Sequence, residues 1–90
     1  MTISSGNKIP YDVRLTKEAA KDIKLLLPAV KRKLEYLLRY VIAVDPFSGK
    51  KLVGDLSGFY SLRLSYKDRI VYSINETTVY IHRARTHYGD

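Results

Sequence analysis

The chain has 90 residues, enough for one hydrophobic core and too few for a second. It has no cysteine, which excludes disulfides, thiol catalysis and cysteine-ligated zinc, and no apolar run approaches the roughly 18–20 residues that span a bilayer. Sixteen basic against nine acidic residues give a formal charge of +7, which suits a surface that binds nucleic acid, one that meets an acidic protein, or an ordinary basic surface that favours solubility. Since the opening segment lacks the hydrophobic stretch of a secretory signal, we expect a cytoplasmic protein with a flexible tail over 1–8 and a single domain over 9–90.

The first half of the chain predicts one strand and two helices. Residues 11–15 alternate between apolar and polar, and Thr16 is a good N-cap for the helix that follows. Apolar residues then recur at helical spacing, and Pro28 ends this helix or begins the next. A second apolar stripe predicts a helix that runs to about residue 44.

The second half changes to the alternation of strands. It predicts strands over 59–65, 69–75 and 79–86, and their connections are short enough to force an antiparallel meander. The order strand, helix, helix and three strands predicts a single small α+β domain, in which the meander packs on a helical hairpin that covers one face.

The uncovered face of this predicted sheet is basic. Same-face residues on neighbouring strands lie within about 5–8 Å, and the segment from residue 50 to residue 88 holds seven basic residues but only three acidic ones. Crowded arginines with few acids favour a bound anion, because the planar guanidinium matches phosphate. The alternative is that they are solvated surface charges, with Arg69 paired to Asp68 or Glu76. The residues predicted on this face are Arg63, Arg69, Arg83, Arg85 and His87.

The two histidines receive different interpretations. By strand alternation His82 lies on the face opposite to Arg83 and Arg85, so we expect it to be structural. His87 shares the face of the arginines, and an imidazole can give or take a proton near neutral pH. Tyr88 could stack on a base, bind phosphate or simply pack. We expect no cofactor and no metal, because the sequence has neither a glycine-rich phosphate loop nor a cluster of histidines and acids.

Several motifs resemble the RelE/ParE toxin superfamily, over residues 45–88. They are Pro46-Phe47-Ser48-Gly49, Leu52, Leu56-Ser57-Gly58-Phe59-Tyr60-Ser61-Leu62-Arg63-Leu64 and Asp68-Arg69-Ile70-Val71-Tyr72-Ser73-Ile74. The ending Arg85-Thr86-His87-Tyr88 resembles the Arg-x-His-Tyr ending of the YoeB (Txe) branch. The helical half agrees only in pattern.

This resemblance implies a toxin of a type II toxin–antitoxin system with the RelE-like fold. It implies an mRNA interferase that enters the ribosomal A site, where the ribose 2′-oxygen attacks the adjacent phosphorus and the 5′-oxygen leaves without a metal. It also implies a partner, an acidic, helical, RelB-like antitoxin that holds the toxin inactive in a hetero-oligomer.

The same resemblance assigns roles to residues. Arg63, Arg69 and Arg85 would hold the scissile phosphate and stabilise its developing charge. His87 would protonate the leaving oxygen, and Tyr88 would orient the phosphate or stack on a nucleotide. The further cations expected to bind RNA are Lys50, Lys51 and Arg83.

The residue at the position of the general base differs from the one that the family pattern has there. YoeB-like toxins carry a glutamate where this chain has Lys50, followed by Lys51, and RelE has a lysine on the next strand where this chain has Ser61. Lys50 or Lys51 could take the proton as an uncharged amine, or His87 could act alone. Two other functions stay open: a ParE-like toxin that inhibits gyrase, and a non-catalytic basic module that binds RNA or protein.

Overall fold

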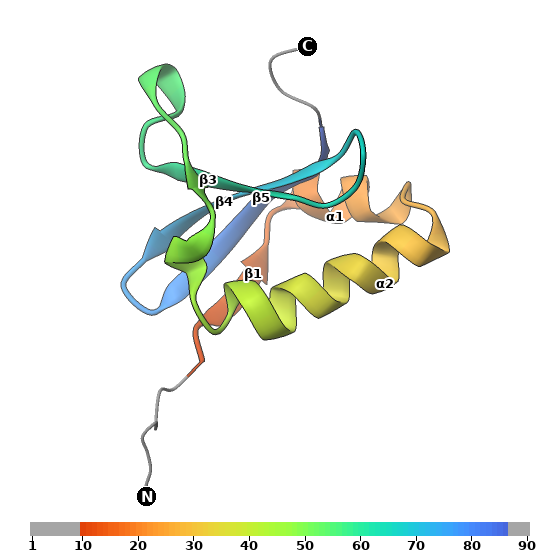
Figure 1. Cartoon of the computed structure of the whole chain (residues 1–90), viewed down its shortest axis with the longest axis horizontal. Helices are drawn as coiled ribbons and strands as arrows, with labels where there is room; N and C mark the ends of the chain where they lie inside the picture. Colours follow the sequence, from red (N-terminus) through yellow and green to blue (C-terminus); the bar gives the residue numbers. More distant parts are fainter. Residues whose placement is uncertain (1–9, 87–90) are drawn as a thin grey trace, which may run out of the picture.

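The computed structural model describes residues 10–86, which form a five-stranded sheet and two helices (Figure 1). The strand order is β1-β5-β4-β3-β2, with β1 parallel to β5 and the other neighbours antiparallel. The predicted α+β class and meander are confirmed. The parallel pairing of β1 and the short β2 were not predicted, and the expected tail lies outside the described residues. The strands are β1 (Asp12–Leu15), β2 (Lys50–Lys51), β3 (Phe59–Arg63), β4 (Arg69–Asn75) and β5 (Thr78–Thr86).

The two predicted helices begin at the residues that the sequence indicated. Helix α1 (Lys17–Lys24) is capped by the side-chain oxygen of Thr16, which accepts a hydrogen bond from the Ala19 N–H at 3.1 Å. Helix α2 (Pro28–Leu37) starts with proline at its first position and continues into a π-helical turn (Leu38–Ile42). None of the helices within residues 10–86 is long and apolar enough to cross a membrane.

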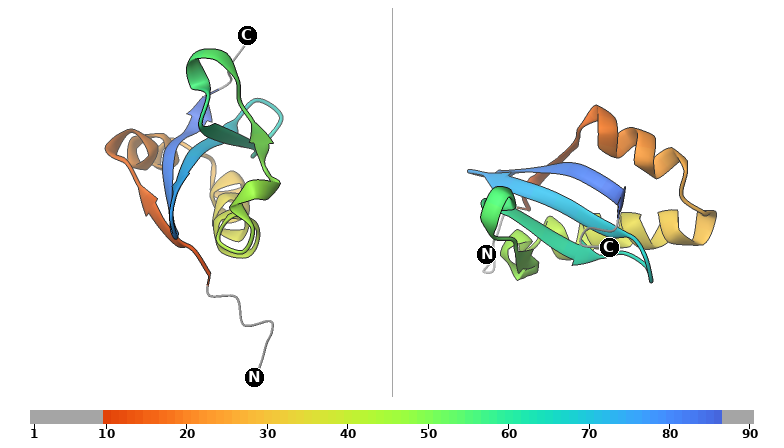
Figure 2. Two further views of the ribbon diagram at one scale, coloured as in Figure 1. Left: turned by 90° about the vertical axis from the view of Figure 1, so that its left-hand side faces the viewer. Right: turned by 90° about the horizontal axis from the view of Figure 1, so that it is seen from above.

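Both helices contribute to one hydrophobic core, but they meet the sheet differently. The core joins Leu34 of α2 and Ile42 of the π-helical turn to Ile70, Tyr72 and Ile81 of the sheet. Helix α1 also lies alongside β5 beyond the end of β1, and Figure 2 shows α1 and α2 on different sides of β5. Helix α1 therefore occupies the edge where another strand could otherwise pair.

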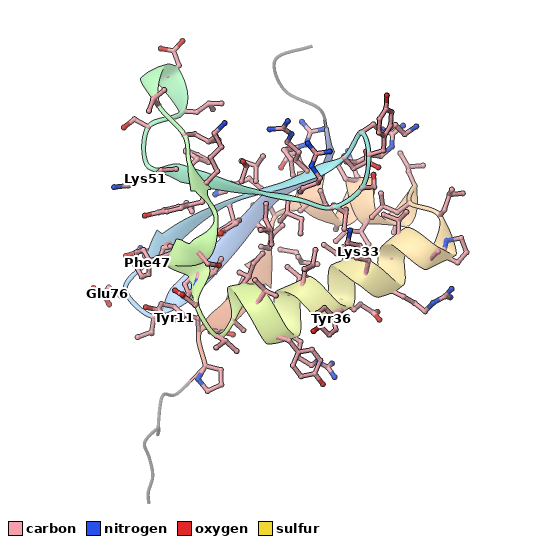
Figure 3. The ribbon with its side chains drawn as sticks, in the orientation of Figure 1. Tyr11, Lys33, Tyr36, Phe47, Lys51 and Glu76 are labelled. Atoms are coloured by element: carbon pink, nitrogen blue, oxygen red, sulfur yellow. The ribbon has the colours of Figure 1, made fainter. Side chains whose placement is uncertain are left out.

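Aromatic rings hold the segment before β2 on the sheet. The Phe47 ring meets those of Tyr11 and Tyr60 edge-on, with centroids 6.4 Å and 5.9 Å apart (Figure 3). Tyr60 stacks on Tyr72 at 5.7 Å, and the Tyr72 hydroxyl donates a hydrogen bond to the Pro46 carbonyl at 2.8 Å. Burial raises the pKa of Tyr72 to about 12. These contacts fix where β2 meets the rest of the sheet.

Gly49 lies directly against this hydrogen bond. A Cβ at residue 49 would overlap the Tyr72 hydroxyl and lie 3.0 Å from the Ser61 carbonyl. We expect Gly49→Ala to break the Tyr72 hydrogen bond, displace β2 and lower the free energy of unfolding by about 1–3 kcal/mol. Urea denaturation would measure this loss, with Val53→Ala, at an 83% exposed side chain, as the neutral control. If Gly49→Ala unfolded at the same urea concentration as the wild type, the loop would be shown to tolerate the methyl group.

Candidate functional site

Strands β3 and β4 place two arginines directly opposite each other. Arg63 pairs in register with Arg69, and cross-strand partners have Cβ atoms about 4.5–5.5 Å apart. Like charges at this spacing destabilise a sheet. In the part of the chain that the structure describes, the ion pairs are Arg14–Asp12 and Arg83–Asp22, so neither Arg63 nor Arg69 is neutralised there. A bound anion would relieve their repulsion.

The two acids that could have paired with Arg69 are placed elsewhere. Asp68 is buried, and its carboxylate accepts a hydrogen bond from the Ser65 hydroxyl at 2.9 Å within the β3–β4 turn. Glu76 lies in the β4–β5 turn, at the other end of β4 (Figure 3). The alternative of local charge pairing is therefore not found for Arg69 among residues 10–86.

Lys50 joins the two arginines, whereas Lys51 does not. Lys50 pairs in register with Ser61, two residues before Arg63 on β3, so both reach the same side of the sheet. Lys51 pairs with Tyr60 and points away from the sheet (Figure 3). We call the resulting hollow, of about 290 Å³, the basic depression; it is lined by Lys50, Ser61, Leu62, Arg63 and Arg69.

Ser61 also lines the basic depression, although the sequence pattern assigned it no role in the site. It is 5% exposed, and within residues 10–86 its hydroxyl makes no hydrogen bond. Its strand alternation with Arg63 was the signal that could have found it. Nearly all buried polar groups in proteins have hydrogen-bond partners. The Ser61 hydroxyl is an exception within residues 10–86, and it therefore needs a functional explanation.

Arg83 is held by helix α1 instead of facing the basic depression. Its guanidinium donates hydrogen bonds to the Asp22 carboxylate at 2.8 Å and 3.2 Å, and the Ala84 N–H donates to the same carboxylate at 3.1 Å. Burial alone would raise the pKa of Asp22, but these hydrogen bonds and the positive charges of Arg83 and Arg85 lower it overall. The expectation that the sheet arginines lack acidic partners is therefore wrong for Arg83. Its side chain is still 41% exposed, and its contact with RNA stays a prediction.

Arg85 lies near the basic depression but does not line it. It is exposed, and it borders a second hollow of about 480 Å³ between the α1–α2 connection and the β3–β4 turn. The next residue, Thr86, is the register partner of Arg69, which places Arg85 at the same end of the sheet. His87 and Tyr88, the predicted proton donor and phosphate-orienting residue, lie outside the described residues.

His82 lies on the opposite face from the one expected. Its Nε2 is 2.8 Å from the Ser73 hydroxyl, and its ring packs against Phe59 with centroids 4.9 Å apart. Phe59 alternates with Arg63 on β3, so His82 shares the face of the basic depression. Burial lowers the pKa of His82, opposed by the negative charge of Glu18. Its contacts agree with the structural role expected for it.

The cause of this difference is a β-bulge between β4 and β5. Tyr72 pairs with Ile81, but the preceding residue, Val71, pairs with Arg83. The strand β5 therefore holds one extra residue, His82, at this point, and the alternation of faces changes beyond it. A second register shift follows between Arg69 and Val71.

Known proteins share this sequence and fold. Residues 15–88 match the model of a family described as a YoeB-like toxin of bacterial type II toxin–antitoxin systems. The chain belongs to this family. The toxin is 33% identical over 82 residues to Toxin RelK of Mycobacterium tuberculosis, across 84% of this chain and 96% of that one. It is 43% identical over 51 residues to Toxin YoeB of Streptomyces coelicolor, across 52% of this chain and 61% of that protein.

The fold of the toxin is similar to that of solved relatives. A chain in the crystal structure of the toxin–antitoxin complex RelBE2 from Mycobacterium tuberculosis superposes with a TM-score of 0.79 at 30% identity, over 88% of the toxin and 100% of that chain. The YoeB/ParE toxin from Agrobacterium tumefaciens has a TM-score of 0.76 at 24% identity, over 86% of the toxin and 99% of that chain. The expected superfamily and fold are thus confirmed.

Proposed function

We propose that the toxin is a metal-independent endoribonuclease that cuts ribosome-bound mRNA in the cytoplasm and so inhibits translation. The observation that supports this most directly is the basic depression, where Arg63 and Arg69 face each other beside Lys50 without an acidic partner in the described residues. Guanidinium groups bind phosphate oxygens in pairs, and a phosphodiester between two arginines would neutralise both.

The proposed reaction needs charge stabilisation and two proton transfers. The ribose 2′-oxygen bonds to the adjacent phosphorus while the bond from phosphorus to the 5′-oxygen breaks, which leaves a cyclic phosphate and a free 5′-hydroxyl. Arg63 and Arg69 stabilise the charge that develops on the phosphate oxygens. Lys50 would take the proton of the 2′-hydroxyl, since it lines the basic depression and Lys51 does not. His87 gives a proton to the 5′-oxygen.

Two further residues would act beside the scissile phosphate. Arg85, at the same end of the sheet as Arg69, would help to hold the scissile phosphate. Tyr88 would orient the scissile phosphate or stack on a nucleotide. Arg83, which was also expected to bind RNA, would in addition fix β5 against α1 through its ion pair with Asp22.

An antitoxin is the second part of the proposal. RelBE2 from Mycobacterium tuberculosis and YoeB–YefM from Staphylococcus aureus are toxin–antitoxin complexes. The net charge of +7 and the basic depression favour an acidic, helical partner whose carboxylates occupy the site and block cleavage. The resulting complex would be a hetero-oligomer.

Primer extension on an mRNA in a translating extract tests the proposal. We expect the wild-type toxin to cut the message on the ribosome, and His87→Ala and Arg85→Ala to abolish cutting while the circular dichroism spectrum stays unchanged. An intact message with active ribosomes would overturn the proposal. Inhibition of gyrase supercoiling would then indicate the ParE-like function, and RNA binding without fragmentation would indicate a non-catalytic module.

A further inference from the structure

Ser61 carries a buried hydroxyl group that has no hydrogen-bond partner among residues 10–86. Its side chain is 5% exposed. The hydroxyls of Ser48, Ser65 and Ser73 each make a hydrogen bond of 2.8–2.9 Å, while that of Ser61 makes none with any residue in the range 10–86. A hydroxyl that loses its water without gaining a partner destabilises the folded state. A bound ligand is one explanation for such a group.

The strand neighbours of Ser61 leave only the side toward the basic depression open, so a hydrogen-bond partner for its hydroxyl has to bind there. Lys50 lies directly across from it on β2, and Val71 is its partner on β4. Val71 is apolar and 1% exposed, so it offers no hydrogen bond and closes that side. Ser61 lines the basic depression together with Arg63 and Arg69, and this hollow is open to solvent.

Ser61 differs from the other side chains that line the basic depression in the hydrogen bonds that it can form. Charged lysine and arginine side chains only donate hydrogen bonds, and the leucine side chain neither donates nor accepts them. Apart from Lys50 in its proposed role as base, Ser61 is therefore, among the described residues that line the basic depression, the side chain that can both accept and donate. Three cations can bind phosphate oxygens, but a hydroxyl on the sugar needs an acceptor as well.

We propose that Ser61 binds the ribose 2′-hydroxyl of the substrate, so that the basic depression recognises RNA in preference to DNA. The inference rests on the proposed function and names the group that selects its substrate. Before the reaction, the Ser61 oxygen accepts the single hydrogen of the 2′-hydroxyl and donates its own proton to a phosphate oxygen. This holds the 2′-oxygen beside Lys50, which takes that hydrogen in place of Ser61 when the reaction begins. The 2′-hydroxyl is the group that distinguishes RNA from DNA.

Two serine variants separate a ligand-binding hydroxyl from a structural one. We expect Ser61→Ala to unfold at the wild-type urea concentration or higher, because a methyl group replaces a hydroxyl without a partner. Ser73→Ala is the matched control on the same face, and it should unfold at lower urea because it leaves His82 without its hydrogen bond. In the primer-extension assay, Ser61→Ala should slow cleavage by about 10- to 100-fold, and Ser73→Ala should leave it unchanged.

Binding by the isolated toxin tests the inference without relying on cleavage. The probes are a short single-stranded RNA and the DNA of the same sequence, measured by fluorescence anisotropy. The wild-type toxin should prefer the RNA by about two- to tenfold, and Ser61→Ala should bring this ratio close to one. Loss of the preference in a toxin that cuts no message would support the inference and refute the proposed function. A ratio that Ser61→Ala leaves unchanged would overturn the inference.

Discussion

Arg69→Ala should reduce the rate of mRNA cleavage by about 10²- to 10³-fold and leave the fold at least as stable. The loss is large because a charged donor to the transition-state oxygens disappears. Stability should hold or rise, since the substitution removes the repulsion between Arg69 and Arg63, its register partner. Single-turnover cleavage on programmed ribosomes and urea denaturation measure the two effects.

Arg14→Ala is the matched control for this prediction. It removes the same charge from an exposed pair with Asp12 on β1, at the far side of the sheet from β3. Cleavage by Arg14→Ala should stay within about twofold of wild type, because a single exposed pair contributes little. Equal losses in the two variants would mean that net charge, and not the basic depression, governs the activity.

Asp22→Ala should cause the largest loss of stability, about 2–3 kcal/mol of the free energy of unfolding. It leaves the Ala84 N–H buried without an acceptor and removes the partner of Arg83. The Arg83 side chain is 41% exposed and can be hydrated, which keeps the loss below that of a fully buried pair. Asp12→Ala, in the exposed pair with Arg14, should cost less than about 0.5 kcal/mol. Urea denaturation compares them, and equal losses would contradict the structural role of Asp22.

The hydrogen bonds of the Asp22 carboxylate also make the stability of the fold depend on pH, in a direction that follows from its pKa. The pKa of Asp22 in the folded toxin lies below its ordinary value, so the carboxylate stabilises the fold above about pH 4, the unfolded value, and that contribution disappears as the pH falls through the folded pKa. Wild-type stability should therefore fall on acidification below about pH 4. Asp22→Asn should be less stable at pH 7 and should lose less on acidification.

The sequence predicted those parts of the site that depend on local signals. Thr16 marks a helix start through its own chemistry and is confirmed as the N-cap of α1, and of the two positions left open for Pro28 the structure shows the start of α2. The juxtaposition of Arg63 and Arg69 follows from alternation and a short turn, because β3 and β4 pair without a bulge. In such a hairpin the strand period alone decides which side chains meet.

The remainder depends on contacts that have no local signal. Asp22 and Arg83 are 61 residues apart, and only the packing of α1 beside β5 brings them together. The bulge at His82 reverses the alternation on β5, and nothing in the composition of that strand marks it. The two-residue strand β2 is too short to show a period, so the separation of Lys50 from Lys51 became visible only in the structure.

The position of α1 has a consequence for how the toxin avoids misassembly. Beyond Ile81, β5 has no neighbouring strand on the α1 side in the described part of the chain, and an open strand edge recruits other chains into aggregates. The Asp22 carboxylate accepts a hydrogen bond from the Ala84 N–H, as the carbonyl of a neighbouring strand would. Thr16 donates hydrogen bonds to the carbonyls of Ile81 and His82. The helix thus protects a strand that carries Arg85, and the end of β5 can present cations to a ligand without inviting another chain to pair with its backbone.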